Sequence, residues 1–371
     1  MNYDIDIVVT YVKPTPLWIE LKDKYYNLEN SVEVKNNDFN GDSRYRDINL
    51  LKYWFRSTIK NCPWLHKIFL VVQDEDQVPE WLNLSCPKLR VVYHREFIPE
   101  ELLPTFNSNC IELHLHKISD LSEHYILCND DTYFLNPIDK NKFFDTSGIP
   151  NYELKMHSGK WHSGNNLFYK TLNNNLRLEH KYIDTNYYYS NPHLQDARLK
   201  SFETYIYNKH EKDILDSLRP SRFRHSSNYT QYLYSDLLKM FKKGNRSNIY
   251  LRSKSIAFVN FKSDTYNRIF TYEMVCLNDT SSTRNFEDIK TKLRNEFSKR
   301  YDTPCIFEKK LRVYILKKKS LGKIDFDNNY LNLIISKNKL NEKYCKVFKD
   351  IDKITYQDIV TIGSNFIWSL S

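Results

Sequence analysis

A short apolar run that ends abruptly in acidic residues constrains this chain of 371 residues more than any other feature. Tyr125–Cys128 predicts a strand buried on both faces, and Asn129, Asp130 and Asp131 follow it at once. Ligands of open α/β sheets bind outside the carboxyl ends of the strands. Carboxylates at this point therefore suit a hard divalent cation that also holds phosphate oxygens. A solvated turn is the other interpretation of the same three residues.

Further apolar runs extend the pattern to a whole sheet. Ile5–Val12, Lys67–Val72 and Leu89–Tyr93 have the length and the residue types of strands. With the helical segments between them, they predict an α/β fold with flanking helices. The expected sheet is open, mixed or mostly parallel, and Rossmann-like or GT-A-like.

Helices are expected between these strands. Ser43–Ser57 opens like a capped helix with apolar residues for the core. Apolar residues recur at helical spacing over 107–121, which places Glu112 and His116 together on a neighbouring face. Residues 195–198 are expected to begin another helix.

Composition excludes several classes of protein. Aromatic residues make up 15% and hydrophobic residues 41% of the chain, which excludes a disordered protein. The net charge of +9 is spread along the chain, so no nucleic-acid partner is expected. Seven cysteines without a CxxC pair, no leader sequence and no apolar run of membrane-spanning length favour a cytoplasmic protein.

Glycine is too scarce for a glycine-rich phosphate loop. The chain has seven glycines and neither a GxGxxG nor a P-loop pattern. Any phosphate group must therefore be held by a metal ion, by Arg or His side chains, or by helix N-termini.

Four separated blocks resemble the Stealth family of sugar-1-phosphate transferases, in the family's order. The second block retains Leu103–Ser108, Glu112 and Asn129–Asp131 at family-like spacing. The first block differs, because Tyr11 and Lys13 stand where the family usually has Trp followed by Asp or Asn. The blocks are Ile5–Val12, Ser43–Pro137, Asn191–Phe241 and Cys276–Glu308.

The resemblance implies a reaction at phosphorus. A hexose-1-phosphate or N-acetylhexosamine-1-phosphate would pass from a nucleotide-sugar donor to a hydroxyl of a saccharide acceptor, expected to be a lipid-linked oligosaccharide. The products would be a phosphodiester in a capsular polysaccharide and a nucleoside monophosphate. The alternatives are a metal-dependent glycosyltransferase that releases a nucleoside diphosphate, and a carbohydrate-binding protein without catalysis.

Roles for individual residues follow from the resemblance and from what the reaction needs. His193 is the leading base, because a neutral imidazole near pH 7 is suited to proton abstraction. The resemblance assigns phosphate stabilisation to Arg224, and makes Glu112 an acidic position that orients a histidine or holds the acceptor. Mg²⁺ or Mn²⁺ would be held by Asp130, Asp131 and Asp279, with Asp131 also acting in catalysis. The expected substrate contacts are Thr10, Tyr11, Arg44, Arg46, Asp47 and Ser108.

The chain is expected to contain one large domain and a small extension. Residues 1–310 would form the catalytic domain, and 140–190 either a lid or acceptor loop or a surface excursion without catalytic role. Residues 311–371 carry eleven Lys or Arg against six Asp or Glu. This extension is expected to dock to the lipid-linked acceptor or to make a peripheral contact at the inner face of the plasma membrane. An ordinary basic subdomain is the alternative.

Overall fold

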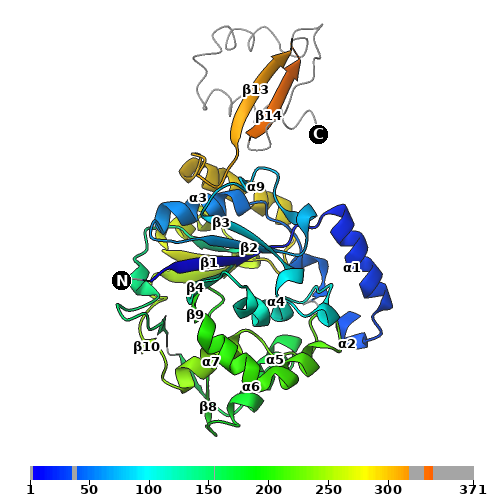
Figure 1. Ribbon diagram of the computed structural model, residues 1–371, viewed down its shortest axis with the longest axis vertical. Helices are drawn as coiled ribbons and strands as arrows, with labels where there is room; N and C mark the ends of the chain where they lie inside the picture. Colours follow the sequence, from blue (N-terminus) through cyan, green and yellow to red (C-terminus); the bar gives the residue numbers. More distant parts are fainter. Residues whose placement is uncertain (1–2, 36–39, 154, 317–329, 337–371) are drawn as a thin grey trace. The chain divides into compact units, whose positions relative to one another are not determined.

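The computed structural model describes residues 3–35, 40–153, 155–316 and 330–336 (Figure 1). The chain divides into two compact units, each made of two segments. The first unit contains the large sheet and every predicted site residue. The units are Met1–Pro79 with Leu84–Phe307, and Glu80–Asn83 with Glu308–Ser371.

The second unit is built on two parallel strands. β13 (Lys310–Leu316) pairs with β14 (Tyr330–Ser336), and a backbone bridge joins Leu82 to Glu308. Most of the basic extension predicted over 311–371 lies outside the described residues. Its docking role stays a prediction.

The central sheet of the first unit has five strands in the order β3-β2-β1-β4-β9. Four strands are parallel and β9 is antiparallel to β4. The predicted α/β fold with a mostly parallel sheet is confirmed, although the first strand ends at Thr10 rather than at Val12. The strands are β1 (Ile5–Thr10), β2 (Ile68–Val72), β3 (Leu89–Tyr93), β4 (His124–Asn129) and β9 (Asp196–Leu199).

A second sheet begins where β4 ends. Asp130 and Asp131 form the turn from β4 into β5 (Thr132–Phe134), which pairs antiparallel with β12 (Met274–Asn278). β12 pairs in parallel with β11 (Ser253–Ala257). The backbone N–H of Leu277 donates to the carbonyl of Asp131 over 2.8 Å. The acidic turn therefore lies at the junction of two sheets.

Helices cover both sides of the central sheet (Figure 1). α3 and α9 lie on one side, and α4, α5, α6 and α7 on the other. The longer helices are α1 (Pro16–Leu28), α3 (Leu51–Asn61), α4 (Ser108–His114), α5 (Leu167–Glu179), α6 (Lys200–Leu218), α7 (Tyr232–Met240) and α9 (Phe286–Arg300). The short helices are α2 (Val32–Lys35) and α8 (Thr265–Arg268). The strands of two or three residues outside the two sheets are β6 (Asn151–Tyr152), β7 (Met156–Ser158), β8 (Tyr187–Tyr189) and β10 (Asn245–Arg246).

Burial of apolar surface explains why these elements assemble. All five residues of β2 are buried, and the strand has apolar residues on both faces, as expected for a strand covered by helices on each side. One large cluster joins β1, β2, β3 and β4 to the helices beneath them. It includes Val8, Phe69, Val71, Val92, Leu113, Tyr125, Leu127, Ile206, Tyr207, Leu233, Tyr234 and Leu237.

Trp54 supports the acidic turn from behind. Its indole N–H donates to the carbonyl of Thr132 over 2.6 Å, and both residues are fully buried. The hydroxyl of Thr132 in turn donates to the carbonyl of Asn129 over 2.9 Å and accepts from its N–H over 3.0 Å. The backbone on both sides of Asp130 and Asp131 is thus fixed by buried hydrogen bonds.

Two helix predictions are wrong. The helix expected over 107–121 ends as α4 at His114, and a 3-10 turn follows. His116 lies in this 3-10 turn, and the centre of its ring is 4.8 Å from that of Tyr207. Residues 195–198 form most of strand β9 instead of starting a helix, because pairing with the edge of β4 overrides local propensity.

Two other segments differ from expectation in their bounds. The helix predicted over Ser43–Ser57 begins only at Leu51, after Asn49 takes a left-handed backbone with φ 57°. Residues 140–190, which show little periodicity, contain α5 and the antiparallel pair of β7 with β8. The notion of a lid or acceptor loop there remains a prediction.

Two further observations concern the cysteines and the helices. Within the described ranges, six cysteines are free thiols and five of them are buried. No described helix is both long enough and apolar enough to cross a bilayer.

We expect Trp54→Phe to lower the free energy of unfolding by about 1–3 kcal/mol. The substitution keeps a large aromatic ring but leaves a buried carbonyl without its donor. Chemical denaturation followed by circular dichroism measures the change. The matched control is Trp161→Phe, at a residue 43% exposed, which should change the free energy by less than about 0.5 kcal/mol. Equal stability of the two variants would contradict a supporting role for Trp54.

Candidate active site

One cavity of about 470 Å³ gathers the predicted site residues. All of them except Asp47 line it within the described part of the chain. They come from the carboxyl ends of β1, β4 and β12, from α4, and from the loops before α3, β9 and α7. The predicted residues that line the cavity are Thr10, Tyr11, Arg44, Arg46, Ser108, Glu112, Asp130, Asp131, His193, Arg224 and Asp279.

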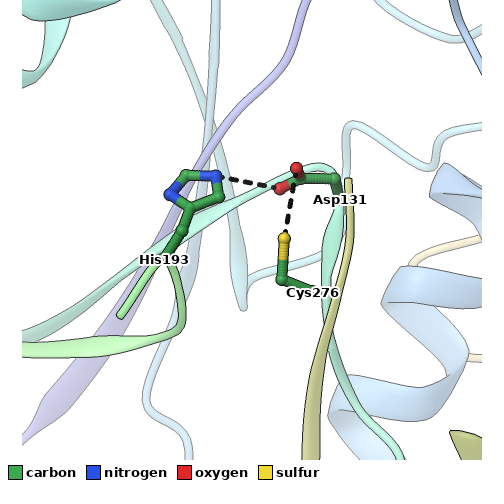
Figure 2. A group of neighbouring side chains, drawn as sticks. All are labelled: Asp131, His193 and Cys276. Carbon is green, nitrogen blue, oxygen red and sulfur yellow. Dashed lines mark hydrogen bonds and ion pairs between the residues drawn. The ribbon is translucent and has the colours of Figure 1, made fainter. Parts of the chain in front are cut away.

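Asp131 stands between a histidine and a cysteine (Figure 2). Its Oδ1 lies 3.5 Å from His193 Nε2, and its Oδ2 accepts a hydrogen bond from Cys276 Sγ over 3.4 Å. Ligand atoms of these three residues lie within 4.8 Å of one another. Residues 145 positions apart, on β12 and beside β4, thus meet at the acidic turn.

The pKa values of His193 and Cys276 are both raised, with different consequences for their charge. Burial disfavours the charged imidazole, but the carboxylate of Asp131 and then that of Glu112 outweigh it, so the pKa of His193 is raised. Burial, reinforced by Asp131, raises the pKa of the Cys276 thiol well above its usual value. The thiol therefore stays protonated, while His193 can accept a proton and keep it beside Asp131.

Asp130 lies among other carboxylates. Burial, followed by repulsion from Asp131 and Asp47, raises the pKa of Asp130 well above its usual range. Asp47 accepts a hydrogen bond from the Tyr11 hydroxyl over 3.0 Å, so the residue that departs from the family pattern anchors this carboxylate. Two neighbouring carboxylates therefore oppose the ionisation of Asp130.

Glu112 is fixed by an amide at the end of β4. Asn129 Nδ2 donates to Glu112 Oε1 over 2.9 Å and to Thr10 Oγ1 over 3.0 Å. Burial raises the pKa of Glu112, although the Asn129 hydrogen bond and the charges of His193 and Arg224 act in the opposite direction. The carboxyl group is therefore held near the predicted base without contacting it directly.

Arg46 and Asp279 are paired with each other. Arg46 Nε and Nη2 donate to the two carboxylate oxygens of Asp279 over 2.8 and 2.9 Å. The guanidinium also lies 4.4 Å from the centre of the Phe286 ring. A metal ion bound by Asp279 would have to displace Arg46, so Asp279 fits the predicted metal role less well than Asp130 and Asp131 do.

Arg224 is positioned by two neighbours. Its backbone N–H and carbonyl both bond to the Asn40 amide over 3.0 Å. Its guanidinium donates to Ser108 Oγ over 3.2 and 2.9 Å. A rigid planar donor group thus lies at the cavity wall, which suits the oxygens of a phosphate.

The loop that carries His193 is tied to α7 by a buried polar cluster. Asn191 Nδ2 donates to Asp236 Oδ1 over 2.7 Å, and Lys239 Nζ donates to Asn191 Oδ1. Asp236 and Lys239 are each 5% exposed. On the other side of the histidine, the Tyr250 hydroxyl donates to the Gln195 carbonyl over 3.0 Å. The backbone on both sides of His193 is therefore held in place.

Sequence reasoning missed several residues of the cavity. Gln73 and His94 line it directly after β2 and β3. The rule that ligands bind at the carboxyl ends of strands could have found both. Cys276 gave no such signal, since its position beside Asp131 depends on the antiparallel pairing of β12 with β5.

Comparison with known proteins decides the family. A sequence model described as Stealth protein CR2, conserved region 2, matches residues 44–152. Capsular polysaccharide phosphotransferase WcwK of Streptococcus pneumoniae is 30% identical over 344 residues, which cover 82% of this chain and 98% of that protein. The chain belongs to the Stealth family.

A second relative and one solved structure are also similar to this chain. Exopolysaccharide phosphotransferase cps2G of Lactiplantibacillus plantarum is 27% identical over 83% of this chain and 97% of its own length. Among solved structures, the galactosyltransferase LgtC in complex with donor and acceptor sugar analogues has 11% identity and a TM-score of 0.35, with 78% of this chain and 99% of that chain covered. The Stealth relatives are named as phosphotransferases, so this chain is a member of an enzyme family.

The Stealth region covers part of the cavity. The matched residues 44–152 contain the acidic turn, Glu112 and Ser108. His193, Arg224 and Asp279 lie after it in the sequence, and the fold brings them to the same cavity. The cavity is therefore lined by segments far outside the matched region as well as by residues within it.

The residues of the acidic turn fit a divalent cation. Within the described residues, Asp131 Oδ1 is buried and has no hydrogen-bond partner, and Asp130 is crowded by Asp131 and Asp47. Carboxylate oxygens are the ligands that Mg²⁺ and Mn²⁺ prefer. The protonated Cys276 is a poor ligand for such hard ions, so we assign the metal-binding potential to Asp130 and Asp131.

We expect Asp131→Asn to lower the pKa of His193. The substitution removes the carboxylate that raises this pKa, while burial, which lowers it, remains. Because the pKa of His193 is raised in the folded state, protonation of His193 stabilises the fold below pH ~6.5. This stabilisation is lost as pH rises through the pKa of His193 in the folded state. NMR titration of the imidazole in chelator-containing buffer, assigned with His193→Gln, measures the shift. An unchanged pKa in Asp131→Asn would contradict the interaction, and Asp288→Asn, on the exposed face of α9, is the matched control.

Proposed function

We propose that this chain transfers a sugar-1-phosphate from a nucleotide sugar to a hydroxyl of a saccharide acceptor, in the synthesis of a cell-surface polysaccharide. The observation that carries the proposal is one cavity that joins an acidic pair, a histidine and an arginine. The similarity to a capsular polysaccharide phosphotransferase over 82% of this chain supports it. The acceptor hydroxyl would form a bond to the phosphorus attached to the sugar, and the bond from that phosphorus to the nucleoside monophosphate would break.

The acidic turn would serve the phosphates. Asp130 and Asp131 would hold Mg²⁺ or Mn²⁺, which neutralises the charge of the pyrophosphate when bound. The crowding of these carboxylates, seen in the raised pKa of Asp130, supports this role. Trp54 and Thr132 would keep the turn in a fixed position while the substrate binds.

Arg224 would stabilise the phosphate in transit. Its guanidinium is oriented by Asn40 and Ser108 and lines the cavity. Preorganised donors lower the barrier most when they need no rearrangement during the reaction. Arg44 also lines the cavity, and its charge acts on His193. Arg46 would contribute only where its pair with Asp279 opens.

His193 would take the proton of the acceptor hydroxyl. Asp131, whose Oδ1 lies 3.5 Å from Nε2, would stabilise the imidazolium that forms. The Asn191 tether to Asp236 and the Tyr250 hydrogen bond would keep the ring at a constant depth in the cavity. A positioned base of this type contributes roughly two to four orders of magnitude in rate.

We further infer a cytoplasmic protein that contacts the inner face of the plasma membrane. The support is the excess of basic residues over 311–371, with eleven Lys or Arg against six Asp or Glu. Juxtamembrane basic residues are attracted to anionic lipids. A lipid-linked oligosaccharide would be the acceptor that such a contact brings within reach.

We expect purified protein to release a nucleoside monophosphate from at least one nucleotide sugar in the presence of Mg²⁺. Excess EDTA should abolish release, and added Mg²⁺ or Mn²⁺ should restore it, because the acidic pair needs a counter-charge. Ion-exchange chromatography of the nucleotide products measures both. A nucleoside diphosphate as product would indicate glycosyl transfer at the sugar carbon. Full turnover in excess EDTA would contradict the metal assignment.

We expect His193→Ala and Arg224→Ala to differ in kinetics. His193→Ala should lose roughly 10²–10⁴ in turnover, together with the decline of rate at acid pH, at nearly unchanged donor affinity. Arg224→Ala should weaken donor binding as well, because a guanidinium on phosphate oxygens acts in the ground state and in the transition state. Initial rates across pH and donor concentration separate the two. Loss of donor affinity alone in His193→Ala would make the histidine a phosphate ligand and not a base.

A further inference from the structure

A connected row of aromatic rings begins at Phe168, which lines the cavity. Phe168 contacts Tyr169 at 5.7 Å between ring centres, and Tyr169 contacts His162 at 5.8 Å. His162 lies 3.9 Å from Tyr188, which stacks on His157 at 5.2 Å with an interplanar angle of 14°. We call these five residues the ring ladder.

The ring ladder lies in the excursion of residues 140–190, between β5 and β9. Phe168 and Tyr169 belong to the first turn of α5, Tyr188 lies in β8, and His157 lies in β7, which pairs antiparallel with β8. Phe168 is 38% and Tyr169 36% exposed, and the other three are half-buried. The rings thus form a surface, since a core cluster would exclude solvent from most of them.

Each end of the ring ladder is connected to a part of the proposed active site. Phe168 itself lines the cavity. At the other end, His157 Nε2 and Ser190 Oγ are hydrogen-bonded over 2.9 Å. Ser190 begins the loop that carries His193, and Asn191 in the same loop is tied to α7. The ring ladder therefore connects the lining of the cavity with the segment that holds the proposed base.

The chemistry of these rings suits a sugar. The C–H faces of pyranose rings pack on aromatic faces, and their hydroxyl groups bond to polar ring edges. Four of the five residues, all but Phe168, carry an O–H or a ring nitrogen. Burial, and then the charge of His157, lowers the pKa of His162, so this ring is neutral near pH 7 and offers both a donor and an acceptor.

We propose that the ring ladder is the acceptor subsite, on which one or more sugar rings of the saccharide acceptor stack while a hydroxyl reaches His193. This inference rests on the proposed function, because it places the acceptor on the side of the base. The acceptor occupies the surface of the excursion, and the donor phosphates occupy the cavity beside the acidic turn. Acceptor recognition and donor chemistry are then carried by different segments of the chain.

The test is saturation-transfer difference NMR of the full chain with a panel of free oligosaccharides. Lactose, N-acetyllactosamine, maltotriose and chitotriose cover hexose and N-acetylhexosamine units. We expect the sugar C–H protons of at least one of them to receive saturation. Tyr188→Leu and Tyr169→Ser should weaken binding of that oligosaccharide at least fivefold, since each removes one ring of the ladder.

The matched control is Tyr205→Ala, which removes a tyrosine 56% exposed on α6. It should bind the oligosaccharide as the wild type does. Thermal melting of all three variants identifies any that fails to fold, and Tyr169→Ser, at an exposed ring, keeps the test available if Tyr188→Leu does not fold.

Three outcomes would overturn the proposal: no binding across the panel, equal binding by the wild type and both ladder variants, or full displacement of the sugar by a nucleoside monophosphate. The last outcome would make the ring ladder a nucleoside site. Slow release of nucleoside monophosphate by the wild type without acceptor tests the proposed function separately. Release without any ladder effect on sugar binding contradicts only the acceptor subsite, and absence of release contradicts the proposed function itself.

Discussion

The short turn between β4 and β5 is the constraint on which the rest of the structure depends. It leads the chain from one sheet to another, and it does so with two adjacent carboxylates, Asp130 and Asp131. Such a turn is unfavourable by itself, because like charges repel and burial disfavours ionisation. Buried hydrogen bonds from Trp54 and Thr132 hold it from one side. Charged groups around the cavity then interact with these two carboxylates.

The positive groups near this turn have different partners. His193 faces Asp131 with a raised pKa, whereas the nearby Arg46 is engaged with Asp279. The buried Asp236 and Lys239 are paired with each other and with Asn191. Desolvation offsets much of the attraction in a buried pair, but breaking it is costly. This cluster therefore contributes more to fixing the His193 loop than to net stability.

Much of the fold could be predicted from the sequence, because its strands are short, apolar and ended by polar residues. Leu89–Tyr93 matches the predicted bounds, and Ile68–Val72 differs by one residue. Edge strand β9 was missed because two of its four residues are charged and its partners on β4 lie 69 to 75 positions earlier in the chain. α4 ends at His114, and His116 just beyond it packs against Tyr207, a long-range contact that no local pattern reports.

The candidate site also contains residues whose position could be predicted from the sequence and residues whose position could not. Asp130 and Asp131 follow a strand, so their place at the carboxyl edge of a sheet was predictable from the sequence. The pairing of Arg46 with Asp279 joins positions 233 apart, and the position of Cys276 depends on strand register. Long-range contacts of this kind have no signature in a single sequence.

The ring ladder lies wholly within the stretch between β5 and β9, whereas the acidic turn, Glu112 and Arg224 lie outside it. If the ladder holds the acceptor, one uninterrupted length of chain sets which saccharide is extended. Recombination or drift within that length could then diversify the polymer a cell displays while the nucleotide-handling strands stay unchanged.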